Sequence, residues 1–65
     1  MTQYTTFKLT PRSAQKELAQ QRRNLQMLSN EYATTSKPDA VRHYMNYARL
    51  AIICAKRGYM LCIAD

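Results

Sequence analysis

The sequence predicts a mainly α-helical domain: an antiparallel two-helix hairpin between two short extended segments, in the order β-α-α-β. Two long stretches carry apolar residues at spacings of three and four, the pattern of amphipathic helices. A short polar connector, 33–37, separates them and lets the second helix fold back on the first. The segments on either side alternate side chains as β-strands do. All 65 residues therefore form one small domain.

The first extended segment is residues 3–9, where β-branched and aromatic side chains favour an extended backbone. Two sets alternate along it: Thr5, Phe7 and Leu9, and between them Tyr4, Thr6 and Lys8. Thr10 is a candidate N-cap for the next element, because Pro11 is favoured at the first helical position. Ser13 is the alternative cap.

The first helix is expected over about 11–33, which is rich in Gln, Arg, Ala and Leu. Its apolar stripe is thin and is interrupted near Gln21 by polar residues. The members of the stripe are Ala14, Leu18, Leu25, Leu28 and Tyr32. A helix with so narrow an apolar face contacts one neighbour and is not surrounded by a core.

The second helix is expected over about 38–57 and has the wider apolar face. Ser36 and Asp39 have the spacing of a capping box, with Pro38 in the first turn. Gly58 follows the last turn and suits a left-handed helix end. The predicted core face consists of Val41, Tyr44, Met45, Ala48, Ala51, Ile52 and Ala55.

The apolar tail, 59–65, alternates again: Tyr59, Leu61 and Ile63 with Met60, Cys62 and Ala64. In a helical hairpin the first segment arrives where this tail departs. The two segments therefore suit pairing as an antiparallel two-stranded ribbon. The alternative is an extended tail that packs on the helices or is kept for a partner.

Catalytic chemistry is not expected, because the usual constellations are missing. Gly58 is the only glycine, so there is no glycine-rich phosphate loop. His43 and Cys54 are eleven residues apart on one helix, about 16 Å along its axis, too far for a nucleophile and its base. We therefore expect no enzyme, no cofactor and no small-molecule substrate.

A metal site is not expected either, since His43, Cys54 and Cys62 are too few for four ligands. We interpret the two cysteines as buried thiols of a reducing compartment, with a disulfide as the alternative. No apolar run approaches the ~20 residues that span a bilayer. The first twelve residues lack a continuous apolar core, so we do not expect them to be a signal peptide. We expect a cytoplasmic protein without a membrane partner.

Positive charge is the strongest compositional feature, with a formal net charge of +6. Two rows follow from helical geometry: Arg42, Arg49 and Lys56 on the second helix, and Arg12, Lys16 and Arg23 on the first. The rows are either a solvated face or a binding site for anions, such as nucleic acid or an acidic protein surface.

Apolar side chains outside the core face predict a protein interface. Leu50 and Ile53 lie off the main stripe of the second helix, and Tyr47 is expected to project away from the core. One neighbouring helix covers only one side, so an apolar strip remains for docking or dimerisation. The candidate partner-binding residues are Tyr47, Ile53, Tyr59, Met60, Leu61 and Ile63.

These features predict a small basic non-catalytic regulator or inhibitor of the phage or plasmid accessory type. It docks on a larger protein, or on itself, through the second helix and the tail. The alternative is a nucleic-acid-binding protein. Protein docking would be abolished by changing exposed apolar side chains. Nucleic-acid binding would be weakened by changing positively charged side chains and would depend on the salt concentration.

The order strand, helix, helix, with Phe7-Lys8-Leu9-Thr10-Pro11-Arg12 leading into the first helix, resembles the ribbon–helix–helix repressors. This resemblance implies a dimer that inserts a two-stranded ribbon into the major groove of DNA. The base-reading positions would be Tyr4, Thr6 and Lys8. The chain departs from that family in its longer first helix, a connector without glycine, and an apolar tail after the second helix.

Overall fold

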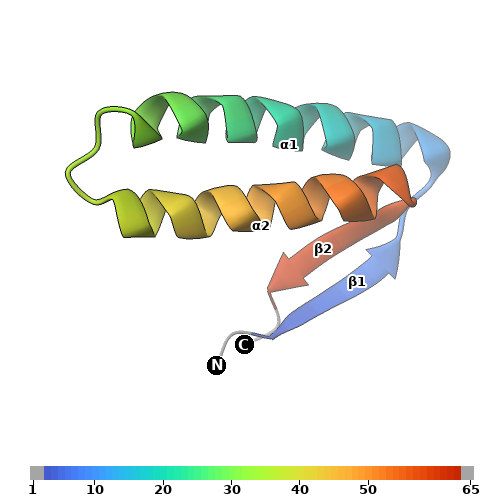
Figure 1. The fold of residues 1–65 in the computed structure, drawn as a ribbon. Helices are drawn as coiled ribbons and strands as arrows, with labels where there is room; N and C mark the ends of the chain where they lie inside the picture. The colour runs from blue at the N-terminus through green and yellow to red at the C-terminus, as the bar shows by residue number, and fades with distance from the viewer. Residues whose placement is uncertain (1–2, 64–65) are drawn as a thin grey trace.

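The computed structural model describes residues 3–63 and has the predicted β-α-α-β order (Figure 1). Its elements are β1 (Tyr4–Lys8), α1 (Pro11–Tyr32), α2 (Pro38–Lys56) and β2 (Tyr59–Ile63). Each helix ends one residue before the predicted end. The last two residues of the predicted tail, 64 and 65, lie outside the described range.

The start of α1 is the predicted one. The Thr10 side-chain oxygen accepts a hydrogen bond of 3.2 Å from the backbone N–H of Ser13, and Pro11 is the first helical residue. This bond satisfies a backbone donor that has no partner within the helix. Thr10, and not Ser13, is therefore the N-cap.

The predicted capping box at the start of α2 is wrong. Lys37 is the N-cap, and no side chain forms a capping hydrogen bond there. Ser36 precedes the cap by one position, so its hydroxyl does not take the capping role. The Thr35 hydroxyl instead accepts a bond of 3.0 Å from the Lys37 N–H. The carboxylate of Asp39 in the first turn still interacts favourably with the positive end of the helix dipole.

The core is the seam between α1 and α2, and small side chains dominate it. Its buried hydrophobic residues among those described are Ala14, Val41, Met45, Ala48, Ala51 and Ala55. Alanine lets two helix backbones approach closely. The apolar stripe of α1 is interrupted near Gln21, as predicted. There the half-buried Gln21 side chain donates a 3.2 Å hydrogen bond to Glu17 Oε1.

The predicted ribbon is present: β1 and β2 pair antiparallel, with Tyr4 opposite Ile63 and Lys8 opposite Tyr59. Gly58 has a φ of +86°, which a left-handed turn between α2 and β2 requires. β2 lies against α2, and β1 is the strand farther from the helices (Figure 1). Within the described range, neither helix is both long and apolar enough to cross a membrane.

Candidate functional site

Tyr47 joins the helices to the sheet. Its hydroxyl donates a 3.0 Å hydrogen bond to the Leu61 carbonyl, and its ring centroid lies 5.8 Å from that of Tyr4. Tyr47 is not among the buried residues of α2, which agrees with the expectation that it projects away from the core, but the side chain is half-buried against the sheet. The reason is the position of β2, which lies beside α2 on the flank that carries Tyr47 and covers it.

Burial also changes the acidity of this phenol. The pKa of Tyr47 is raised above its ordinary value, chiefly because desolvation disfavours the phenolate. Neighbouring groups that can carry negative charge, first Cys62 and then Glu17, add to this effect. Tyr47 therefore stays a neutral hydrogen-bond donor over the physiological pH range.

Tyr44 is the converse case. Helical spacing predicts it on the core face, yet it is 61% exposed, so that prediction is wrong. Tyr44 lies toward the connector end of α2, whereas the sheet begins at the opposite end, after Gly58 (Figure 1). The five-residue strands do not extend far enough to cover it.

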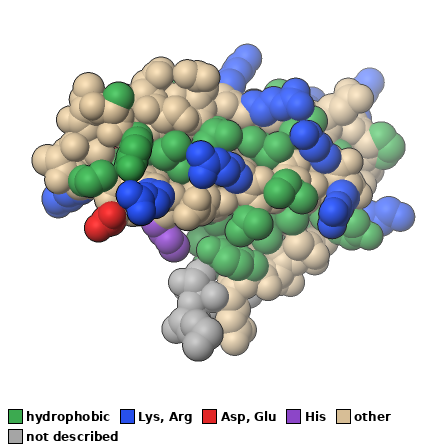
Figure 2. Space-filling model, viewed as in Figure 1, with side chains coloured by type: hydrophobic (Ala, Val, Ile, Leu, Met, Phe, Trp, Pro, Cys, Tyr) green, Lys and Arg blue, Asp and Glu red, His purple; other side chains and the backbone are tan. Residues whose placement is uncertain are grey.

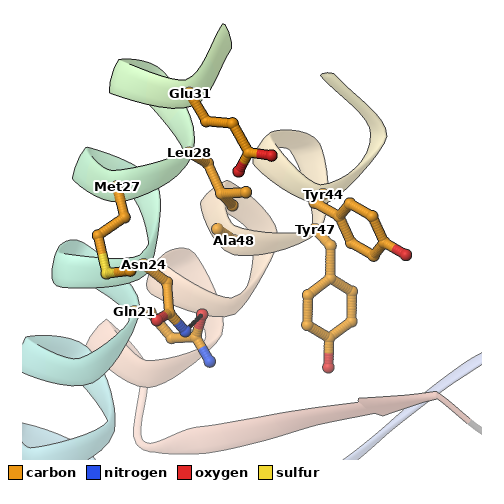
Figure 3. A pocket seen from close by; sticks show the side chains of 8 residues that line it. All are labelled: Gln21, Asn24, Met27, Leu28, Glu31, Tyr44, Tyr47 and Ala48. Carbon is orange, nitrogen blue, oxygen red and sulfur yellow. Dashed lines mark hydrogen bonds between the residues drawn. The ribbon is translucent and has the colours of Figure 1, made fainter. Parts of the chain in front are cut away.

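Tyr44 instead lines a shallow hollow of about 270 Å³ between the helices (Figure 3). Its other apolar or aromatic lining residues are Met27 and Leu28 of α1 and Tyr47 and Ala48 of α2. Glu31 is the one carboxylate among the lining residues. The sequence pattern gives no signal for this hollow, because it places Tyr44 in the seam and does not show where the sheet ends.

The two faces of the sheet differ in their surroundings. Side chains alternate across a strand, so Tyr59, Leu61 and Ile63 share one face and Met60 and Cys62 the other. Met60 borders a hollow with four residues of α1: Ser13, Lys16, Glu17 and Gln20. The Met60 face is therefore turned toward α1, and the Tyr59 face is turned away from it.

Leu50 and Ile53 of α2, like the Tyr59 face, are turned away from α1. The buried residues of α2 face α1, and these two project from the opposite side by helical geometry. We call the combined surface the α2–β2 face; it consists of Leu50, Ile53, Tyr59, Leu61 and Ile63. Figure 2 shows hydrophobic side chains gathered over α2 and the adjoining sheet, with Lys and Arg side chains beside them.

Most of the α2–β2 face is open to solvent. Leu50, Ile53, Tyr59 and Ile63 are 44%, 48%, 41% and 54% exposed, and Leu61 is half-buried. Of the predicted partner-binding residues, Ile53, Tyr59, Leu61 and Ile63 belong to the face defined in this way. Met60 lies on the other side of the sheet, and Tyr47 lies between α2 and the sheet. Leu50, which is not among the predicted partner-binding residues, also belongs to the face.

The basic row of α2 borders this face. Arg42, Arg49 and Lys56 are all exposed. Arg42 donates to the Tyr32 hydroxyl and Arg49 to the Asn46 amide oxygen, each at 3.3 Å. The bond from Arg42 to Tyr32 raises the pKa of the guanidinium. Both partners are neutral, so neither bond neutralises the positive charge.

The three basic residues of α1 are exposed as well: Arg12, Lys16 and Arg23. Lys16 borders the Met60 hollow, on the side of the sheet turned toward α1. The two rows therefore border different faces of the ribbon, and the α2 row is the one beside the α2–β2 face.

The candidate metal ligands of the sequence are the two cysteines and His43. Cys54 and Cys62 are free thiols and are half-buried, more open than the expected buried thiols. His43 is exposed, with its ring centroid 6.0 Å from that of Tyr44. Among residues 3–63, no three His, Cys, Asp or Glu side chains are grouped so as to hold a metal ion.

Comparison with known proteins gives no family for this chain: no protein-family model matches it, and no similar curated protein or solved structure was found.

Proposed function

We propose that this protein is a non-catalytic regulator or inhibitor that binds a larger protein through the α2–β2 face. The observation that supports this proposal is the exposure of four large apolar side chains that are turned away from α1: Leu50, Ile53, Tyr59 and Ile63. Contiguous exposed apolar surface with a polar border is typical of protein interaction sites. Association removes this surface from water and so stabilises the complex.

The charge around the face indicates the chemistry of the partner. Arg49 and Arg57 are four residues before and after Ile53, so by helical spacing they lie on the same side of α2. Arg49 and Arg57 are both exposed. A partner surface with an apolar centre and carboxylates at its rim complements this arrangement and accelerates association by electrostatic attraction. We therefore propose an acidic protein surface as the docking site.

The experiment compares capture of partner proteins from a cell lysate by the wild-type protein, Ile53→Asp and Met27→Asp. Met27 is 69% exposed and lies on α1, outside the α2–β2 face. Both substitutions replace an exposed apolar side chain with a carboxylate and change the net charge equally. We expect Met27→Asp to retain proteins that Ile53→Asp loses, with native circular dichroism for both variants. Equal retention by both would contradict the proposal.

A second variant tests the β2 end of the face. Ile63→Asp is more informative than Leu61→Asp, because Leu61 is half-buried and its carbonyl accepts the Tyr47 hydrogen bond. We expect Ile63→Asp to lose the same captured proteins as Ile53→Asp. If it retains them all, the binding surface is confined to α2.

Nucleic-acid binding is the second candidate function, favoured by the exposed cations Arg42, Arg49 and Lys56 on one side of α2. Fluorescence anisotropy with labelled duplex and single-stranded DNA tests it at several salt concentrations. Reversing the charge at Arg42 and Arg49 would then weaken binding and reduce the slope of log affinity against log salt by about two, because each arginine that neutralises a phosphate accounts for about one. An unchanged slope would exclude this row as the binding site.

A further inference from the structure

Strand β1 has one edge that faces β2 and one that faces solvent. The Leu9 N–H donates to the Gly58 carbonyl at 2.8 Å, so the backbone groups of Leu9 point toward β2. Backbone direction alternates along a strand, so Phe7 and Thr5 also point inward, whereas Tyr4, Thr6 and Lys8 point outward. No backbone hydrogen bond within residues 3–63 reaches the outward groups of these three residues.

The outer edge of β2 is different, because α2 covers it. The Leu61 carbonyl belongs to this edge, and it accepts the hydrogen bond from the Tyr47 hydroxyl. All five residues of β1 are exposed, whereas the three central residues of β2 are half-buried. Figure 1 shows β1 on the side of the ribbon away from the helices. A strand approaching β1 from that side meets no helix of this chain.

We propose that a second copy of this chain occupies this edge, with β1 paired antiparallel to β1 of the second copy about a two-fold axis. The product is a four-stranded sheet in the order β2–β1–β1–β2. This inference does not rest on the proposed regulatory function, because it uses the edge of the sheet and leaves the α2–β2 face open.

The pattern of side chains selects one register. With Thr6 opposite Thr6 of the second copy, Tyr4 lies opposite Lys8 and Lys8 opposite Tyr4. This two-fold register pairs all three outward residues. It also separates the two Lys8 side chains by four residues along the strand, or about 14 Å. A slip that places Lys8 opposite Lys8 leaves the other outward groups unpaired and brings like charges together.

The pairing corrects a weakness of the single chain. An isolated two-stranded ribbon is marginally stable, and an exposed edge strand is a template for further pairing. Each of the three residue pairs exchanges two backbone hydrogen bonds in the dimer. The two-fold axis runs perpendicular to the sheet, so both α2–β2 faces lie on the same side of the four-stranded sheet.

Sedimentation equilibrium of the wild type, Thr6→Pro and Thr6→Val tests the proposal. Proline at position 6 lacks an N–H, but this N–H points outward and is not used by the β1–β2 ladder. The two hydrogen bonds that Thr6 exchanges with Thr6 of the second copy would both be lost. This loss should raise the dimer dissociation constant about tenfold or more. Thr6→Val keeps the N–H and should remain dimeric, as should Ile53→Asp.

A wild-type protein that stays monomeric, or a Thr6→Pro variant as dimeric as the wild type, overturns the proposal. Dissociation by Ile53→Asp together with an intact Thr6→Pro dimer would assign self-association to the α2–β2 face. Circular dichroism of Thr6→Pro shows whether the chain remains folded.

A cross-linking measurement gives an answer that does not depend on Thr6→Pro folding. Residues that exchange both hydrogen bonds across an antiparallel pair have Cα atoms about 5.5 Å apart, which a disulfide spans. Thr6→Cys should therefore form a covalent dimer under oxidising conditions. Lys8→Cys is the matched control, because its two copies are about 14 Å apart in this register. The wild type measures any contribution of Cys54 and Cys62, and equal cross-linking of both variants overturns the register.

Discussion

At the residue scale, Tyr47 determines how the ribbon is attached to the helices. Its hydroxyl reaches the Leu61 carbonyl and its ring lies against Tyr4, so one side chain contacts both strands. The Tyr47→Phe variant keeps the ring and removes the hydrogen bond. We expect a loss of about 0.5–1.5 kcal/mol in the free energy of unfolding near pH 7, measured by urea denaturation. Tyr44→Phe is the control, because that phenol is exposed, and it should change stability little.

The same variant tests the raised pKa of Tyr47. A raised folded-state pKa means that the folded protein holds the phenolic proton more tightly than the unfolded chain does. This contribution to stability is complete below the unfolded pKa of about 10 and is lost as the pH rises through the folded pKa. The stability advantage of the wild type over Tyr47→Phe should therefore shrink above about pH 10. Parallel stability curves from pH 8 to 11 would show that burial does not perturb this phenol.

The two helix starts provide a second test at this scale. Thr10 caps α1 with its side chain, whereas Ser36 forms no capping bond at α2. We expect Thr10→Ala to cost about 1 kcal/mol and Ser36→Ala to stay within about 0.5 kcal/mol of the wild type, by thermal or urea unfolding. A comparable loss in both variants would mean that Ser36 caps α2 in solution.

At the scale of elements, α1 and α2 contact each other through a seam made mostly of alanine. Ala48 and Ala51 are each 2% exposed and Ala14 is 8% exposed, so small side chains set the closeness of the two helices. Periodicity predicted both helices and most of this seam. It did not show where along α2 the sheet lies, because Tyr44 and Tyr47 are three residues apart on the same side of the helix and only the ribbon determines which of them is covered.

Gly58 connects two elements, and its substitution tests that connection. Its φ of +86° is unfavourable for residues with a Cβ, but an added Cβ would have no neighbour within 4 Å. We expect Gly58→Ala to cost about 1–2 kcal/mol, from backbone strain alone. Gly58→Asn should cost less, because asparagine tolerates the left-handed region, and urea denaturation compares the two variants. Equal losses would mean that the side chain meets an obstacle.

At the scale of the whole molecule, the chain forms a thin body of 38 × 27 × 12 Å with a small core. Large apolar side chains remain exposed on both helices and both strands: Tyr4, Phe7, Met27, Tyr32, Tyr44, Leu50, Ile53, Tyr59 and Ile63. A chain of this length rarely gains more than about 3–5 kcal/mol from its own core. Association with a partner or a second copy would add burial that the monomer lacks.

The proposed dimer makes thermal stability depend on protein concentration. Mass action favours a folded dimer as concentration rises, so the midpoint temperature of unfolding should increase over a hundredfold dilution series. The Thr6→Pro variant should show a smaller dependence over the same series. A wild-type midpoint that is independent of concentration would argue against any folded dimer, whichever surface forms it.

The sequence by itself determined the two helices, the Thr10 and Gly58 boundaries, and the alternation that marks both strands, because these depend on local propensity and periodicity. It also identified Leu50 and Ile53 as apolar residues that a single neighbouring helix leaves uncovered. Only the tertiary structure decided that Tyr47 connects α2 to the sheet, that Met60 faces α1, and that β1 is the strand with a solvent-exposed edge. These depend on which flank of α2 the ribbon lies against, and that choice is made by packing between segments far apart in the chain.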